Sequence, residues 1–162
     1  RAGLVDGLKT PRVFATADIR ASDMVRGVAT SGWQGRSFSL GIADAVTVLA
    51  QTAAKADAAA TVIANAVDLP GHAAVKRVPA NLLSPDSDLG ERPVVRAVGR
   101  LTADEIAAAL EAGRAVAEGL RGRGLIAAAA LHLQGETVLV GPLQTTSVNE
   151  TAAEGRMVGG HG

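Results

Sequence analysis

The stretch AKADAAATVIANAVD, residues 54–68, combines an apolar composition with four short polar side chains. Its alanine-rich pattern predicts a buried helix over residues 52–68, which ends at the Leu-Pro-Gly of residues 69–71. At 100° per residue the polar side chains fall within an arc of roughly 80°; they are Asp57, Thr61, Asn65 and Asp68. Short oxygen-bearing side chains in so narrow a stripe predict that this face of the helix meets something small, polar and internal.

The composition excludes several classes of function. The 162 residues suffice for one domain, and with only 2% aromatic residues its core must consist of Ala, Val, Leu and Ile. Sixteen basic and sixteen acidic residues leave no net charge, so nucleic acid and membrane surfaces are not expected as partners. The absence of cysteine excludes disulfides and thiolate chemistry. No apolar run reaches the ~20 residues of a membrane span, and we expect a cytoplasmic protein.

The remaining pattern predicts an α+β fold, with a mixed or antiparallel sheet packed against helices and a C-terminal β-hairpin. Strands are expected at residues 13–19, within 27–41 as strand-turn-strand, at 46–49 and at 93–99. A second helix is expected to begin at a capping box formed by Thr102 and Glu105 and to end near residues 121–124. Two strands around the turn QGET, residues 134–137, complete the hairpin.

Two segments are expected to have little regular structure. Residues 72–93 contain three prolines and an acidic turn, which indicates a long connection. Residues 144–162 lose all periodicity and are predicted to be a flexible tail after a single domain portion over residues 1–143. The chain starts at Arg1 without Met, so we expect a fragment or a processed chain.

The polar stripe is a candidate metal site. Asp57 and Thr61 lie one helical turn apart, and Mg²⁺ needs only one or two protein oxygens because it keeps several waters. The alternative is structural: Thr61 bonds back to a helix carbonyl and Asp57 meets an arginine from another strand. The D-x-x-x-T spacing is common by chance and alone favours the alternative.

The stretch TSGWQGRSFSLG, residues 30–41, is a candidate phosphate loop. Backbone amides beside Ser31, Gly32 and Gly35 could cradle a phosphate, with Arg36 as its charge partner. The stretch fits neither the P-loop nor the dinucleotide fingerprint, and the alternative is a glycine-rich hairpin. Trp33 could stack on a flat ring or serve as a core or lid residue. His72, His132 and His161 are scattered, and we expect structural roles for them.

Three segments in this order and spacing carry a resemblance: ATSG at 29–32, SFSLGIADAVTVLA at 37–50 and ADAAATVIANAV at 56–67. They resemble the C-terminal half of ApbE-type flavin transferases, with their T-S-G strand, V-T-V strand and A-D-A-x-A-T helix. The chain is more similar still to an uncharacterised bacterial and archaeal family that shares the ApbE-like fold. The resemblance is close over residues 10–70, and it implies that the N-terminal part of such a protein is absent.

The resemblance implies a ligand and a metal. Asp57 and Thr61 would bind Mg²⁺, and a flavin (FAD or FMN) or another phosphorylated small molecule would lie along Thr30, Ser31 and Gly32, with Arg36, Ser37 and Ser39 beside it. The interval at 33–44 lacks the histidine and the D-P-x-T-G of the transferases, so we expect binding in preference to FMN transfer. If the protein is an enzyme, the metal would polarise a phosphoryl oxygen.

Two alternatives remain open. One is a non-enzymatic ligand-binding or accessory protein, and the other is a fragment whose polar stripe packs against missing residues. A partial fold would expose sheet edges, so we expect a homo-oligomer or association with a missing N-terminal segment.

Overall fold

The computed structural model describes residues 1–20, 22–143 and 145–147 and confirms the α+β class. Its helices are α1 (Ala53–Ala66), α2 (Ala80–Leu83) and α3 (Ala103–Gly122). Its strands are β1 (Ala2–Val5), β2 (Val13–Ala17), β3 (Gly27–Ser31), β4 (Ala45–Ala50), β5 (Val75–Pro79), β6 (Pro93–Val98), β7 (Ala128–Leu133), β8 (Glu136–Val140) and β9 (Thr145–Ser147).

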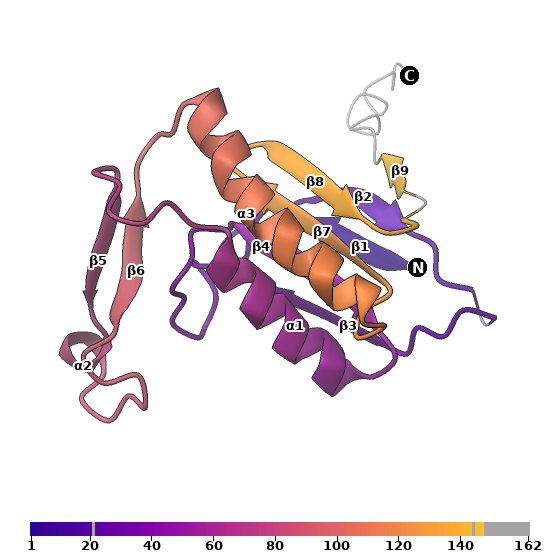
Figure 1. Ribbon diagram of the computed structural model, residues 1–162, viewed down its shortest axis with the longest axis horizontal. Helices are drawn as coiled ribbons and strands as arrows, with labels where there is room; N and C mark the ends of the chain where they lie inside the picture. Colours follow the sequence, from indigo (N-terminus) through magenta and orange to yellow (C-terminus); the bar gives the residue numbers. More distant parts are fainter. Residues whose placement is uncertain (21, 144, 148–162) are drawn as a thin grey trace, which may run out of the picture.

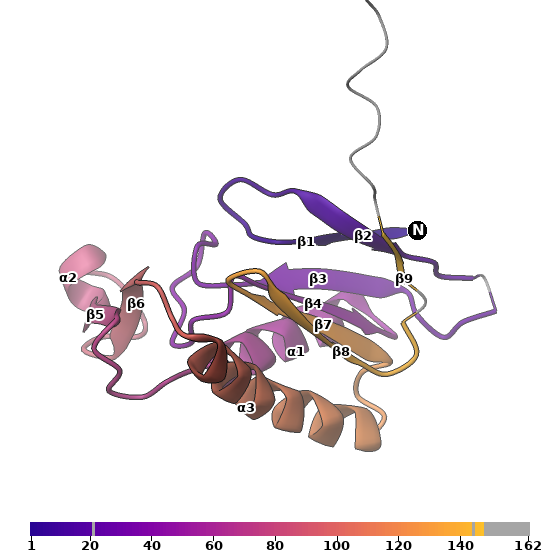
Figure 2. The ribbon, with the colours of Figure 1, turned by 90° about the horizontal axis from the view of Figure 1, so that it is seen from above.

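The body of the molecule has three layers (Figures 1 and 2). The central layer is an antiparallel sheet with strand order β3-β4-β7-β8. Helices α1 and α3 cover one face of it, and the antiparallel sheet β1-β2-β9 lies over the other (Figure 2). Because layers cover both faces, every residue of β4 and β7 is buried.

Small residues let the helices lie close to each other and to the sheet. A Cβ atom on Gly113 of α3 would lie 2.3 Å from a methyl group of Val67 and 2.8 Å from one of Leu131. The core-facing side chains of α1 are Ala56, Ala59, Ala60, Ile63 and Ala64. The alanine-rich composition therefore builds a tightly packed core without large aromatic side chains.

The structure confirms the capping box predicted at the start of the second helix. It also confirms the predicted hairpin, which is formed by β7 and β8. Thr102 Oγ1 accepts from the Glu105 amide, and the Glu105 carboxylate accepts from the Thr102 amide at 2.7 Å. The turn between β7 and β8 needs only Gln134 and Gly135, whose φ angles of 45° and 94° suit a two-residue hairpin loop. Glu136 and Thr137, predicted as part of the turn, already belong to β8.

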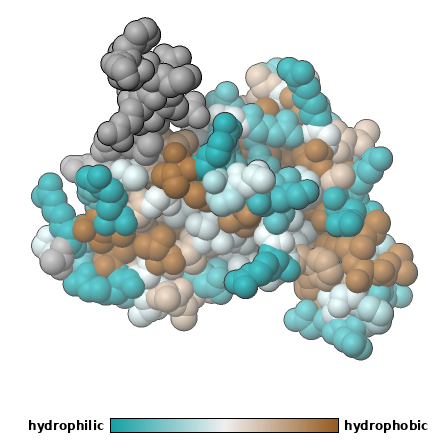
Figure 3. Space-filling model, turned by 180° about the vertical axis from the view of Figure 1, so that it is seen from behind, coloured by the Kyte–Doolittle hydropathy of each residue, from teal (hydrophilic) through white to brown (hydrophobic). Residues whose placement is uncertain are grey.

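The prediction that residues 72–93 are a long connection with little regular structure misses a strand and a short helix. They contain β5 and α2, and β5 pairs with β6 to form an arm at the side of the body (Figure 1). Pro79 and Pro93 form the last pair of the β5–β6 ladder. Their missing N–H groups therefore remove no hydrogen bond from the interior of the ladder. Hydrophobic side chains gather over this arm, with Leu82 75% exposed (Figure 3).

Two further segments differ from expectation. After β3 the chain forms no second strand before β4, so the strand-turn-strand predicted within 27–41 is wrong in its second strand. Strand β9 pairs with β2 inside the segment assigned to the tail, while residues 144 and 148–162 lie outside the described residues, so the tail there stays a prediction. Among the described residues, no helix combines the length and hydropathy that crossing a membrane requires.

Candidate functional site

The two candidate segments of the sequence line one pocket of about 480 Å³. It lies between the loop that follows β3 and the polar face of α1. All eight predicted ligand and metal residues line it: Thr30, Ser31, Gly32, Arg36, Ser37, Ser39, Asp57 and Thr61. Gly35 of the predicted phosphate loop and Asn65 of the polar stripe line it as well, together with Leu8, Gln34 and Phe38, which were not predicted to contact a ligand. The structure therefore brings the predicted residues together, and their roles toward a ligand stay predictions.

The polar stripe of α1 divides into two parts. Asp57, Thr61 and Asn65 face the pocket, whereas Asp68 forms an ion pair with Arg77 of β5. Asp57 and Thr61 are exposed, so the expectation of an internal polar face is wrong and the stripe lines an open pocket. In the described part of the chain neither side chain makes a hydrogen bond or an ion pair, so the structural alternative for them is not realised here.

Three polar side chains of the pocket are used to hold its wall. Thr30 Oγ1 lies 2.9 Å from Thr47 Oγ1 across the pair β3–β4. Ser39, which is 5% exposed, donates to the carbonyl of Gly41 at 2.9 Å. Asn65 Oδ1 accepts from the backbone amide of Leu40 at 3.0 Å. These contacts join β3 to β4 and the loop to α1, and within the described residues they leave Ser31, Ser37 and Thr61 as the pocket hydroxyls without a hydrogen bond.

The glycines of this loop have a packing role. A Cβ atom on Gly32 would lie 2.3 Å from the carbonyl oxygen of Asp44, so only glycine permits this approach. Two amides of the predicted cradle bond within the protein, since the Gly35 amide donates to the Gly32 carbonyl at 3.1 Å and the Trp33 amide donates to the Ala43 carbonyl at 2.9 Å, and the cradle stays a prediction. Among the described residues, the backbone N–H groups of 36–38 make no hydrogen bond and lie in the same loop.

The pocket contains one cationic and one anionic side chain, Arg36 and Asp57, both exposed. No group of three or more His, Asp or Glu side chains that could hold a metal ion occurs in the described residues. A single carboxylate and a hydroxyl do not suit an ion held by protein ligands alone. They do suit Mg²⁺ that takes its other ligands from water and from a bound phosphate.

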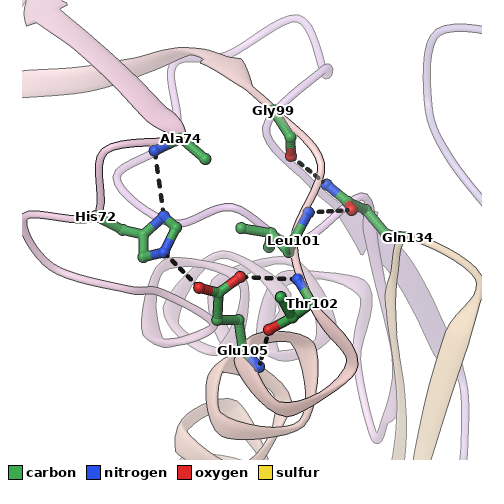
Figure 4. Close-up of polar contacts among 7 residues, drawn as sticks. All are labelled: His72, Ala74, Gly99, Leu101, Thr102, Glu105 and Gln134. Carbon is green, nitrogen blue, oxygen red and sulfur yellow. Dashed lines mark hydrogen bonds and ion pairs between the residues drawn. The ribbon is translucent and has the colours of Figure 1, made fainter.

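The two described histidines, His72 and His132, lie outside this pocket and have structural partners. His72 Nε2 donates to Glu105 at 2.8 Å and its Nδ1 accepts from the Ala74 amide, joining the loop after α1 to the first turn of α3 (Figure 4). Beside them, Gln134 Oε1 accepts from the Leu101 amide and Gln134 Nε2 donates to the Gly99 carbonyl (Figure 4). These bonds link the β7–β8 turn to the connection between β6 and α3.

His132 lies between the two sheets of the body. Its ring stacks on Phe14 of β2 with centroids 5.3 Å apart, and its Nδ1 lies 2.8 Å from Thr137 Oγ1. Burial lowers its pKa, and the nearby carboxylates of Asp44, Asp6 and Glu136 oppose this shift. His161 lies outside the described residues.

The comparisons with known proteins correct one expectation. The model of a protein family described as "AbpE bacteria" matches residues 1–139, and no curated protein and no solved structure matches the chain. The match begins at the first residue and spans nearly the whole chain, so the expectation of a C-terminal part of an ApbE-like protein is wrong, and a relationship to the ApbE flavin transferases is not shown. The chain belongs to the family described as "AbpE bacteria".

Proposed function

We propose that the pocket between the β3–β4 loop and α1 binds a phosphorylated small molecule together with Mg²⁺. The observation that carries this proposal is the convergence of Asp57 and Thr61 with Arg36 and Ser37 on one open pocket. A carboxylate with a hydroxyl supplies the oxygens that a hard cation prefers, and a guanidinium with hydroxyls suits phosphate oxygens.

The loop supplies the phosphate contacts. The Arg36 guanidinium can donate two parallel hydrogen bonds to a phosphate, and the hydroxyls of Ser31 and Ser37 can donate as well. The backbone N–H groups of 36–38, which bond to nothing else in the described residues, add further donors along the same loop.

The helix supplies the metal contacts. Asp57 Oδ and Thr61 Oγ1 would hold Mg²⁺, which would neutralise phosphate charge and polarise a phosphoryl oxygen. Phe38, which is 39% exposed at the pocket's edge, offers an aromatic face to the organic part of the ligand. Flavin nucleotides are one group of ligands with this combination of ring and phosphate.

The test is a titration of the purified chain with FMN, FAD and inorganic pyrophosphate, each with Mg²⁺ and with chelator, read as the shift in Tm. We expect at least one ligand to raise Tm with Mg²⁺ and to lose most of this effect with chelator. Asp57→Asn should abolish the Mg²⁺ dependence, and Arg36→Gln should weaken binding with or without the metal.

The matched control is Asp86→Asn, an exposed aspartate outside the pocket, which should behave like the parent chain. If no ligand changes Tm, the proposal is wrong. If a ligand binds equally well with chelator and in Asp57→Asn, the metal part is wrong and a non-enzymatic ligand-binding or accessory protein is favoured.

A further inference from the structure

A second pocket of about 550 Å³ adjoins the first and contains the chain's only tryptophan. Its lining residues come from three segments: Lys9 from the β1–β2 turn, Trp33, Gln34 and Gly35 from the loop after β3, and Val95 and Arg96 from β6. Figure 2 shows this turn and this loop at the end of the body that faces the β5–β6 arm. Gln34 and Gly35 also line the first pocket, so the two pockets share a wall.

The indole of Trp33 is held in place at this pocket. Its Nε1 donates to Asp44 Oδ1 at 2.9 Å, and its backbone amide donates to the carbonyl of Ala43 at 2.9 Å. Part of the ring packs against the main hydrophobic core, and the side chain is only partly buried. An immobilised indole that keeps accessible surface is a stacking platform for a planar ring, because the fold already fixes its orientation and ligand binding loses no further side-chain entropy there.

The two charged side chains that line this pocket are both cationic. Lys9 and Arg96 are exposed, neither forms an ion pair with a described residue, and no carboxylate is among the six lining residues. Arg77 on the neighbouring strand differs, because Asp68 neutralises it. Two uncompensated cations beside an aromatic face attract a dianion, and a phosphate monoester carries about −1.5 to −2 at neutral pH.

Tertiary contacts build this pocket. The Val95 amide donates to the carbonyl of Ser39 at 2.9 Å, which fastens β6 of the arm to the loop after β3. Val95 is 6% exposed, and the exposed Arg96 follows it at the irregularity in the β5–β6 pairing. This contact brings Arg96 to the loop that carries Trp33.

We propose that the pocket of Lys9, Trp33 and Arg96 binds a planar aromatic molecule that carries a phosphate monoester, as a nucleoside monophosphate does. The ring would stack on Trp33, and the phosphate would lie between the two cations. This site uses neither Asp57 nor Arg36, so it does not depend on the metal-assisted binding proposed for the first pocket.

Trp33 makes the test direct. The chain has one tryptophan and no tyrosine, so its intrinsic fluorescence reports on this pocket. We would titrate the full chain with AMP, adenosine, inorganic phosphate and 4-hydroxybenzoate, in the presence of chelator. We expect AMP to change the Trp33 emission with the highest affinity, since it alone supplies both the ring and the dianion.

The variants separate the two pockets. Lys9→Gln and Arg96→Gln should each weaken AMP binding about tenfold, the loss of one charged hydrogen bond. Arg36→Gln and Asp57→Asn change the first pocket and should weaken AMP binding less than Arg96→Gln does, whereas Lys76→Gln, an exposed control on β5 outside both pockets, should leave the AMP titration unchanged. Circular dichroism and Tm would establish that each variant is folded.

Several outcomes would overturn this proposal. If AMP leaves the emission unchanged, the site does not bind such a ligand. If adenosine or 4-hydroxybenzoate binds as tightly as AMP, or if Lys9→Gln and Arg96→Gln bind AMP normally, the phosphate contacts are wrong. An AMP response that is lost in Arg36→Gln and kept in Arg96→Gln would assign the ligand to the first pocket.

Discussion

At the residue scale, the candidate site depends on positions that have no side chain. Gly32 and Gly41 flank the loop that lines the first pocket. A Cβ atom on Gly32 would lie 2.3 Å from the Asp44 carbonyl oxygen, and one on Gly41 would lie 2.1 Å from the Ala64 carbonyl oxygen. The loop therefore touches the residues just before β4 at one end and α1 at the other through backbone atoms, which cannot move aside as a flexible side chain can.

We expect Gly32→Ala to lower the free energy of unfolding by about 1–3 kcal/mol, the usual cost of overpacking. Chemical denaturation would measure this change. The matched control is Gly119→Ala in α3, where nothing lies within 4 Å of an added Cβ atom, so the better helix propensity of alanine should stabilise the chain by about 0.5–1 kcal/mol. Equal stability of the two variants would contradict the proposed packing role of Gly32.

At the scale of elements, the start of α3 is joined to the loop that leaves α1. The Glu105 carboxylate accepts from the Thr102 amide and from His72 (Figure 4). The backbone hydrogen bond from Thr102 lowers the pKa of Glu105, and the contact with His72 lowers it further. One carboxylate thus completes a helix cap and fastens the connection that leads to the β5–β6 arm.

A depressed carboxyl pKa has a definite sign in the stability profile. The stabilisation from Glu105 is present above the ordinary glutamate range, near pH ~4.3, and is lost as the pH falls through the depressed pKa of the folded state. We therefore expect Glu105→Gln to be less stable than the parent chain at neutral pH, with a difference that shrinks in acid. Urea denaturation at several pH values would measure it.

The control for this experiment is Glu91→Gln, an exposed glutamate with no hydrogen bond or ion pair to any described residue. Its difference from the parent chain should stay small throughout. A Glu105→Gln difference that is independent of pH would show that the carboxylate charge does not stabilise the cap.

At the scale of the whole molecule, His132 connects the two sheets. It belongs to β7 of the central sheet and stacks on Phe14 of the outer sheet, with Thr137 as its hydrogen-bond partner. Burial lowers its pKa, which means that the folded state favours the neutral ring. Protonation would place a charge in the layer between the sheets.

We expect the chain to lose stability as the pH falls through the ordinary histidine range, near pH ~6.5, because the unfolded state then binds a proton that the folded state resists. His132→Gln should lose less stability over the same interval. The urea midpoint at each pH would measure this, and an equal loss in His132→Gln would contradict the assignment.

The expectation of a homo-oligomer also belongs to this scale and stays a prediction. The central sheet ends in β3 and β8, and the described residues place no further strand beside either. Such edges are templates for pairing with another chain. Light scattering of the purified chain would measure the association state.

Local patterns in the sequence identified some of the elements and the candidate residues, but not β5 and α2. Helical periodicity marked α1 and its polar stripe, the capping box marked the start of α3, and the buried apolar runs marked β4 and β7. These features depend on neighbours within a few residues, since helix caps, turns and periodic faces are short-range effects.

Only the tertiary structure decided which residues meet. It separated Asp68, which pairs with Arg77, from Asp57 and Thr61, which line the open pocket. It paired β5 with β6 despite their prolines, and it brought Lys9 and Arg96 to Trp33 from distant parts of the chain. Such contacts depend on the order of strands and on backbone packing at glycines, which no local periodicity encodes.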